Sequence, residues 1–122
     1  MAEMQVGRDL DAAVARAIGW RTFEGVYTHK LFAIDLDKMT RSWQPSTSNA
    51  DALAALIEWR DGGPYRSVTI VSGDARRWEI RLYDGGLPGG TRNRCGRAVC
   101  DRLAEAICRA ILALEATNAE AH

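Results

Sequence analysis

The segment "GGLPGGTRNRCGR", residues Gly85 to Arg97, contains three arginines and directly precedes a long apolar stretch. Backbone N–H groups at the start of a helix carry partial positive charge, and glycines let such groups approach a phosphate closely. Arg92, Arg94 and Arg97 would then hold the anion with charge-assisted hydrogen bonds. The segment therefore predicts either an exposed anion-binding loop or, as the alternative, a mobile surface connection.

The same segment lacks the features of known nucleotide-binding motifs. No Lys-Ser/Thr pair follows its last glycine, so it is not the phosphate-binding loop of nucleotide hydrolases. Its glycine spacing also differs from that of a dinucleotide fingerprint. The sequence therefore predicts no cofactor, and an anion at this loop would be a ligand or part of a partner.

The three cysteines predict neither a disulfide framework nor a metal site. Their odd number suits reduced thiols in the cytoplasm. A predicted helix from Ala98 onward would bury Cys100 and Cys108 on one side, about 12 Å apart, which is too far for a shared metal. Only His29 and His122 are available as further ligands, and no zinc spacing results. Cys95 lies in the arginine-rich loop, where positive charge would favour the reactive thiolate.

Catalytic groups in a recognisable order are missing. Asp35 and Asp37 would point the same way in an extended chain and suit a divalent cation, while His29 is a candidate base. No arrangement of nucleophile, base and orienting group accompanies them. The sequence thus assigns no catalytic residue and favours binding over catalysis.

Four tryptophans are many for this length, and their default role is core packing. Trp43 fits that role least well, because it stands between Arg41 and Pro45 in a loop-like stretch. An exposed indole there would stack on a flat ligand. Trp43 and His29 therefore join the three arginines as predicted binding residues.

Two helices are predicted in the first half of the chain. Apolar residues recur at helical spacing over residues 9–18, with Asp9 as the N-cap and Gly19 placed to end the helix. The segment 44–63 predicts a second helix, in which Ser48 and Asp51 resemble a capping box. Its predicted buried stripe consists of Leu53, Leu56 and Ile57. Residues 20–35 between them predict one or two irregular strands or an ordered loop.

The second half predicts a hairpin and a terminal helix. Residues 66–86 read as two strands about Gly73-Asp74, because apolar residues alternate on both sides of that turn. On the first strand Val68 and Ile70 share one face, and the second strand carries its own apolar face. From residue 98 onward the apolar residues predict a helix that packs on this sheet, with Glu105 and Arg109 paired on its polar side. The apolar face of the second strand consists of Trp78, Ile80 and Leu82.

Length and composition indicate a single α+β domain spanning residues 1–122. The expected architecture is an antiparallel sheet of three or four strands packed with two to three helices as an αβα sandwich. Sixteen basic and sixteen acidic residues cancel, which disfavours a nucleic-acid partner. The sequence lacks an apolar run of membrane-spanning length and a secretory signal pattern, so we expect no membrane partner and a cytoplasmic location.

In order along the chain, "LDAAVARAIGW", "PSTSNADALAAL", "WEIRLYDGG" and "AEAICRAILAL" resemble the small bacteriophage proteins of the phage ABA sandwich domain family. The resemblance covers most of the chain and implies an α+β sandwich of phage or prophage origin. It implies no general activity and no catalytic residue, since its motifs are patterns of helix and strand.

The resemblance to phage proteins and the lack of a recognisable set of catalytic residues lead to one functional expectation. The protein would be a non-enzymatic accessory that interferes with a process of the host cell, such as a bacterial defence system. It would bind a host protein or sequester a small anionic, nucleotide-like ligand, with its homo-oligomeric state left open. The alternatives are a small enzyme acting on a phosphorylated substrate and a structural or assembly accessory.

Overall fold

The computed structural model describes residues 5–25, 31–34, 40–72, 77–85 and 94–120. This part of the chain forms three helices and two three-stranded antiparallel sheets. In chain order the elements are α1 (Arg8–Ala17), β1 (Arg21–Glu24), β2 (Leu31–Ile34), β3 (Thr40–Ser42), α2 (Asn49–Asp61), β4 (Arg66–Ser72), β5 (Trp78–Asp84), β6 (Arg94–Cys100) and α3 (Leu103–Glu120).

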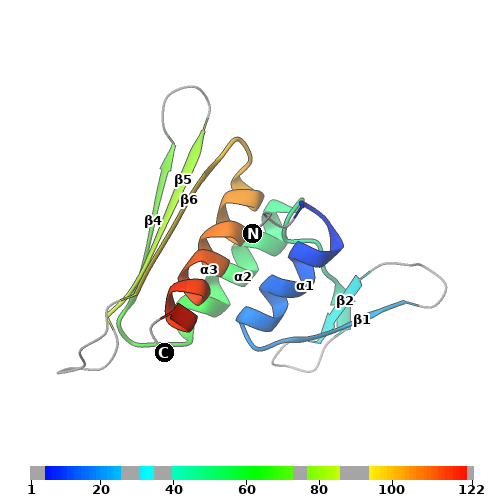
Figure 1. Ribbon diagram of the computed structural model, residues 1–122. Helices are drawn as coiled ribbons and strands as arrows, with labels where there is room; N and C mark the ends of the chain where they lie inside the picture. Colours follow the sequence, from blue (N-terminus) through cyan, green and yellow to red (C-terminus); the bar gives the residue numbers. More distant parts are fainter. Residues whose placement is uncertain (1–4, 26–30, 35–39, 73–76, 86–93, 121–122) are drawn as a thin grey trace.

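The helices lie between the two sheets. Figure 1 shows the larger sheet, β4-β5-β6, on one side, α2 and α3 against it, then α1, and the smaller sheet, β1-β2-β3, beyond α1. The predicted α+β class and the sandwich packing are thus confirmed. The structure adds a second sheet, because the segment expected to hold one or two irregular strands contributes β1 and β2 and is followed by β3.

Helix α1 begins and ends at glycines. Gly7 occupies the N-cap position with φ 141° and supplies no side-chain cap, so Asp9, the predicted cap, lies within the first turn instead. Gly19 follows the helix with φ 88°, a left-handed conformation that glycine adopts without steric cost. The predicted stop at Gly19 is therefore correct.

Ser48 caps helix α2, as the sequence predicted. Its hydroxyl accepts a hydrogen bond from the backbone N–H of Asp51 at 3.3 Å, which satisfies one of the free donors of the first turn. The Asp51 carboxylate does not complete a capping box. It accepts from the backbone N–H of Gln44 at 2.9 Å and so fixes the turn that leads into the helix.

The buried face of α2 differs from the predicted one. Leu53 and Ile57 are 39% and 58% exposed, so the predicted stripe is wrong at both positions. Apolar residues surround this helix on several sides, and the face rich in alanine packs against α3 because small side chains allow a close approach. That face consists of Ala52, Ala55, Leu56 and Trp59.

The predicted hairpin is present as β4 and β5, although its turn at residues 73 and 74 lies outside the described residues. The register pairs Val68 with Leu82 and Ile70 with Ile80, and paired residues of antiparallel strands share a face. Both predicted apolar sets therefore lie on one side of the sheet. Ile80 and Leu82 are buried on that side, which the helices cover.

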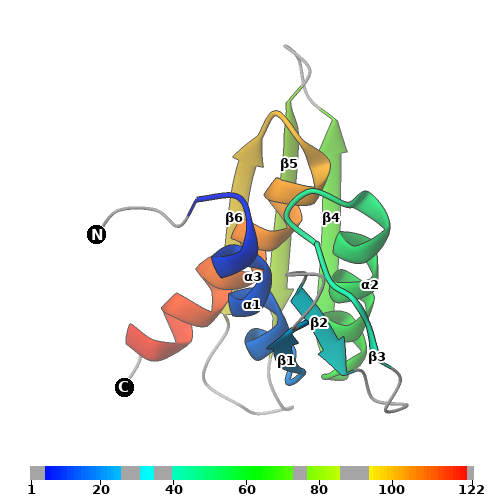
Figure 2. The ribbon, with the colours of Figure 1, turned by 90° about the vertical axis from the view of Figure 1, so that its right-hand side faces the viewer.

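The largest correction concerns the segment before α3. The predicted helix from residue 98 is wrong there, because residues 94–100 form strand β6, which pairs with β5 over all seven positions. Helix α3 starts at Leu103 and crosses the inner face of β5 and β6, as Figure 2 shows. Ile107 and Leu114 are fully buried, as predicted, in the same core as Ile80 and Leu82.

Gly96 allows β6 and α3 to pack closely. A Cβ atom at this position would collide with the carbonyl oxygen of Ala110 and would lie 2.7 Å from the Cβ of Leu114. No side chain fits between the two elements at this point. Gly96, within the arginine-rich segment, thus serves packing.

No helix within the described ranges combines the length and apolarity needed to cross a membrane.

Candidate functional site

The arginines of the predicted anion-binding loop lie in a strand where the structure describes them. Arg94 and Arg97 belong to β6, while Arg92 lies outside the described residues. Successive side chains of a strand point to opposite faces, so residues three apart face opposite sides. The predicted gathering of Arg94 and Arg97 on one exposed surface is therefore wrong.

Arg94 points to the inner face, where it is largely buried. Its guanidinium lies 2.7 Å from the Asp84 carboxylate and 3.9 Å from that of Glu115, and its side chain is only 17% exposed. Arg66 contacts the same carboxylate oxygen of Asp84, Oδ2, at 3.2 Å. Arg94 thus belongs to the folded scaffold.

Arg66 extends this charged cluster to helix α2. It donates to the backbone carbonyl of Trp59 at 2.6 Å, and its guanidinium carbon lies 5.1 Å from the centroid of the Trp59 ring. The cluster of Arg66, Asp84 and Arg94 therefore links α2, all three strands of the larger sheet and α3. Because each charge has a partner, its burial cost is offset.

Arg97 points to the outer face, where its side chain is 64% exposed. It donates two hydrogen bonds to the Glu79 carboxylate, at 3.1 and 3.3 Å, and Arg81 donates to the same group. Hydrogen bonds from Arg97 and Arg81 lower the pKa of Glu79 to about 2. The outer face thus carries two exposed guanidinium groups around one firmly ionised carboxylate.

Trp43 is a core residue, so its predicted role as an exposed stacking platform is wrong. It is fully buried, and its ring centroid lies 4.6 Å from that of Trp20. Its indole N–H donates to the backbone carbonyl of Asp11 at 2.8 Å, which satisfies the polar end of the ring. His29, the other predicted residue of that region, lies outside the described residues.

Asp11 is a buried carboxylate beside Trp43. It accepts a hydrogen bond from the backbone N–H of Ser46 at 2.7 Å, and its burial raises its pKa. The hydroxyl of Ser46 accepts in turn from the N–H of Gly7 at 3.1 Å. These bonds fasten the start of α1 to the segment before α2.

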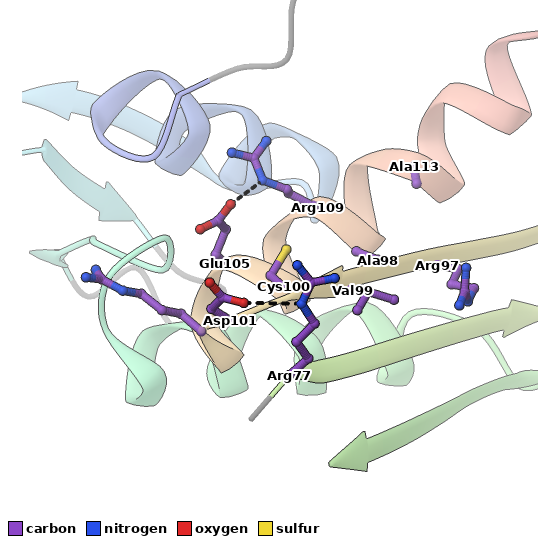
Figure 3. A pocket seen from close by; sticks show the side chains of 10 residues that line it. Arg77, Arg97, Ala98, Val99, Cys100, Asp101, Glu105, Arg109 and Ala113 are labelled. Atoms are coloured by element: carbon purple, nitrogen blue, oxygen red, sulfur yellow. Dashed lines mark hydrogen bonds and ion pairs between the residues drawn. The ribbon is translucent and has the colours of Figure 1, made fainter. Parts of the chain in front are cut away.

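A hollow with charged walls lies between β6 and α3. It measures about 580 Å³, within the range of roughly 300–1,000 Å³ found for ligand sites. Its wall consists of residues 97–102, together with Arg77 at the start of β5 and one stripe of α3. We call this hollow the β6–α3 groove. The α3 stripe comprises Glu105, Arg109 and Ala113, spaced four residues apart (Figure 3).

Positive charge is in excess in the β6–α3 groove. Four arginines and two carboxylates line it, an excess of two arginines, and one of the four, Arg97, also pairs with Glu79 outside the lining. The four arginines are Arg77, Arg97, Arg102 and Arg109, and the carboxylates are Asp101 and Glu105.

The arginines of the groove differ in how firmly they are held. Arg109 donates to Glu105 at 2.7 Å with both side chains mostly buried, as the predicted helical pair required. Arg77 lies 3.4 Å from Asp101, but both side chains are more than 60% exposed. Arg102 makes no ion pair with any described residue and is exposed. Exposed pairs are weak, so Arg77, Arg97 and Arg102 can turn to another anion at little cost.

The cysteines are all free, and they lie in three different environments. Cys95 is exposed on the outer face of β6, Cys100 lines the groove, and Cys108 is buried in α3. The prediction that Cys100 and Cys108 share a helix is wrong, because Cys100 ends β6. Burial raises the pKa of the Cys108 thiol and keeps it protonated.

Within the described ranges, no three His, Cys, Asp or Glu side chains cluster closely enough to hold a metal ion. Asp35 and Asp37, the predicted cation ligands, lie outside those ranges. The groove brings together guanidinium groups, which recognise negatively charged groups.

The sequence pointed to Arg97 but missed Arg77 and Arg102. A helix predicted from residue 98 hides the junction between β6 and α3, where Arg102 lies. Two signals mark that junction: the alternation in "RCGRAVC" is typical of a strand, and Asp101 is of a type favoured just before helices.

Comparisons of the chain with protein-family models, with curated proteins and with solved structures found no match.

Proposed function

We propose that the protein is a non-enzymatic binding protein and that its partner presents negative charge to the β6–α3 groove. One observation carries this proposal: Arg77, Arg97 and Arg102, all exposed, are among the residues that line a groove with more arginines than carboxylates. Guanidinium groups bind phosphate and carboxylate with paired hydrogen bonds, and two or more in one groove give orientation as well as attraction.

The contrast with the scaffold cluster supports this assignment. Arg66 and Arg94 have side-chain exposures below 20% and are fixed by Asp84, so they have no capacity for a ligand. Arg97 and Arg77 are both more than 60% exposed. The groove therefore combines exposed arginines with a concave wall. A second hollow of about 560 Å³ near the end of α2 also contains an exposed arginine, Arg60, but its other arginine, Arg66, is held by Asp84.

The resemblance to phage sandwich proteins suggests the source of the partner. In this proposal the groove captures a host molecule, either an acidic surface of a host protein or a nucleotide-like anion, and thereby interferes with a host process such as a defence system. Binding alone would suffice for such a role.

A titration with two anionic probes tests the proposal. The probes are ADP and an acetylated, amidated peptide that alternates glutamate and threonine over the length of β6. We expect at least one of them to shift the amide NMR signals of residues 97–102 in ¹⁵N-labelled protein. The affinity should fall with added salt, because exposed charge contacts are screened over about 8–10 Å at moderate ionic strength.

Matched variants show whether the probes bind to the arginines of the groove or to positive charge elsewhere on the protein. The double variant Arg97→Gln, Arg102→Gln should lose most of the binding, whereas Arg16→Gln, Arg21→Gln should retain it. Arg16 and Arg21 are also exposed but lie in α1 and at the start of β1, away from the groove. Signals that do not move with either probe, or equal losses in both variants, would contradict the proposal. Release of phosphate from ADP would favour an enzyme instead.

A further inference from the structure

We infer that the free edge of β6 accepts an extended acidic segment of a partner protein as a fourth strand of the larger sheet. This inference rests on the proposed function and specifies the class of partner. It follows from the edge of β6, the charges on both sides of it and the shape of the adjoining groove.

Strand β6 is a regular edge strand. It pairs with β5 over all seven residues, and in the described part of the chain it has no neighbour on its other side. In an antiparallel pair, alternate residues turn their N–H and C=O groups away from the partner strand. Such a row of free backbone groups is a template for one more strand.

The groove lies beside this edge. Its wall contains the edge residues 97–100 and, opposite them, the α3 stripe at Glu105, Arg109 and Ala113. An added strand would lie about 4.8 Å from β6, with its side chains alternating between the two faces of the sheet. One set of side chains would therefore enter the groove, and the other would lie on the outer face.

Guanidinium groups are present on both sides. Arg77 and Arg102 line the groove side, while Arg97 and Arg81 are exposed on the outer face at paired positions of β6 and β5. A strand with carboxylates on both faces would meet positive charge on each of them. A single phosphate group would engage only one side, so the distribution favours an acidic polypeptide.

A second copy of the chain fits this edge poorly. Two β6 strands paired antiparallel over their full length, residues 94–100, would place Arg97 opposite its own copy. Like charges at directly opposed positions destabilise a pair of strands. Charge complementarity thus selects an acidic partner over self-association.

The other strand edges lack this combination. The edge of β4 has Ser67, Thr69 and Val71 on its outer face, and its one inward cation, Arg66, is held by Asp84. The edge strands β1 and β3 of the smaller sheet comprise only four and three residues. Strand addition is therefore inferred for β6 alone.

The test compares two peptides that differ only in their backbone. The first is the alternating glutamate–threonine peptide, and the second has the same side chains but an N-methyl group on every amide. Main-chain hydrogen bonds supply the affinity in strand addition, so the methylated peptide should bind about tenfold more weakly or worse. Amide hydrogen exchange at β6 should slow with the first peptide and remain unchanged with the second.

The outcomes separate this inference from the function on which it rests. Equal binding of the two peptides in the groove, or binding of ADP without either peptide, would overturn strand addition and leave an anion-binding groove. No binding of ADP or of either peptide would overturn both proposals. A dimer in which β6 amides are protected without any peptide would show that a second copy occupies the edge, which would also overturn the inference.

Discussion

Arg94 and Arg97 are three residues apart in one strand, yet they have opposite roles. Arg94 faces α3, is largely buried and bridges Asp84 and Glu115. Arg97 faces solvent and shares Glu79 with Arg81. Side chains of a strand point alternately to its two faces. This alternation, more than the number of arginines in the segment, decides which arginine is accessible to a partner.

The same contrast extends to the neighbouring residues of β6. On the inner face, Gly96 leaves no room for a side chain against α3. On the outer face, Cys95 and Val99 are exposed. One strand therefore combines a closely packed inner position at Gly96, which should tolerate little change, with exposed positions on its outer face.

The largest effect is expected where the inner face is tightest. Gly96→Val should reduce the free energy of unfolding by about 3 kcal/mol, near the upper end for overpacking, because the new side chain would collide with α3. Cys95→Val adds a β-branched side chain one position away on the exposed face and is the matched control. Similar urea midpoints for the two variants would show that the two faces do not differ.

The second largest effect is the difference in stability between variants of Arg94 and Arg97. Arg94→Gln should cost about 2 kcal/mol, because it removes a charged hydrogen bond from the largely buried Asp84 carboxylate. Arg97→Gln should lower the melting temperature much less, since its contacts are exposed to solvent. Calorimetry of both variants checks this prediction, and an Arg97 variant that melted below the Arg94 variant would reverse the assignment.

Thiol labelling measures the same contrast without substitutions. Iodoacetamide should modify exposed Cys95 first, Cys100 more slowly, and buried Cys108 roughly tenfold or more behind Cys95, because Cys108 reacts only when the structure opens. Mass-mapped labelling in guanidinium chloride is the control and should bring the three rates together. Modification of Cys108 as fast as Cys95 in native protein would contradict the packing of α3.

The smallest effect concerns Glu79 on the outer face. Arg97→Gln should raise the pKa of Glu79 from about 2 toward its ordinary value of 4.5, because it removes the strongest hydrogen bonds to the carboxylate. A pKa that folding lowers stabilises the protein above pH 4.5, and this contribution is lost as the pH falls toward 2. Carboxyl NMR titrations of the parent and the variant measure the shift. An unchanged Glu79 pKa would mean that Arg97 is not its main partner.

The sequence predicted those elements in which the spacing of apolar residues and the residues that begin or end the element indicate the same structure. Helix α1 has a clean apolar stripe and Gly19 at its end, and α2 has the Ser48 cap. In both cases local chemistry specifies the boundary, so it can be read without tertiary information. The alternation of β4 and β5 about a polar turn is equally local.

The errors arose where tertiary packing decides. Residues 98–100 are apolar enough to extend the pattern of α3, and only their pairing with β5 makes them a strand. Leu53 and Ile57 are as apolar as buried residues, but α2 turns its alanine-rich face to α3. The error at the start of α3 also affected the predicted binding site. The segment before the helix was predicted as a loop with all its arginines exposed, but a strand divides its arginines between two faces.

The most direct test of the account is the binding of ADP and of the glutamate–threonine peptide to Arg94→Gln and Arg97→Gln, measured below the melting temperature of both variants. The account predicts that Arg94→Gln binds as the parent protein does, because Arg94 is held by Asp84 and does not line the groove. Arg97→Gln should bind several-fold more weakly, with the remaining affinity less sensitive to salt. Undiminished binding by Arg97→Gln together with lost binding by Arg94→Gln would contradict the division of roles within β6.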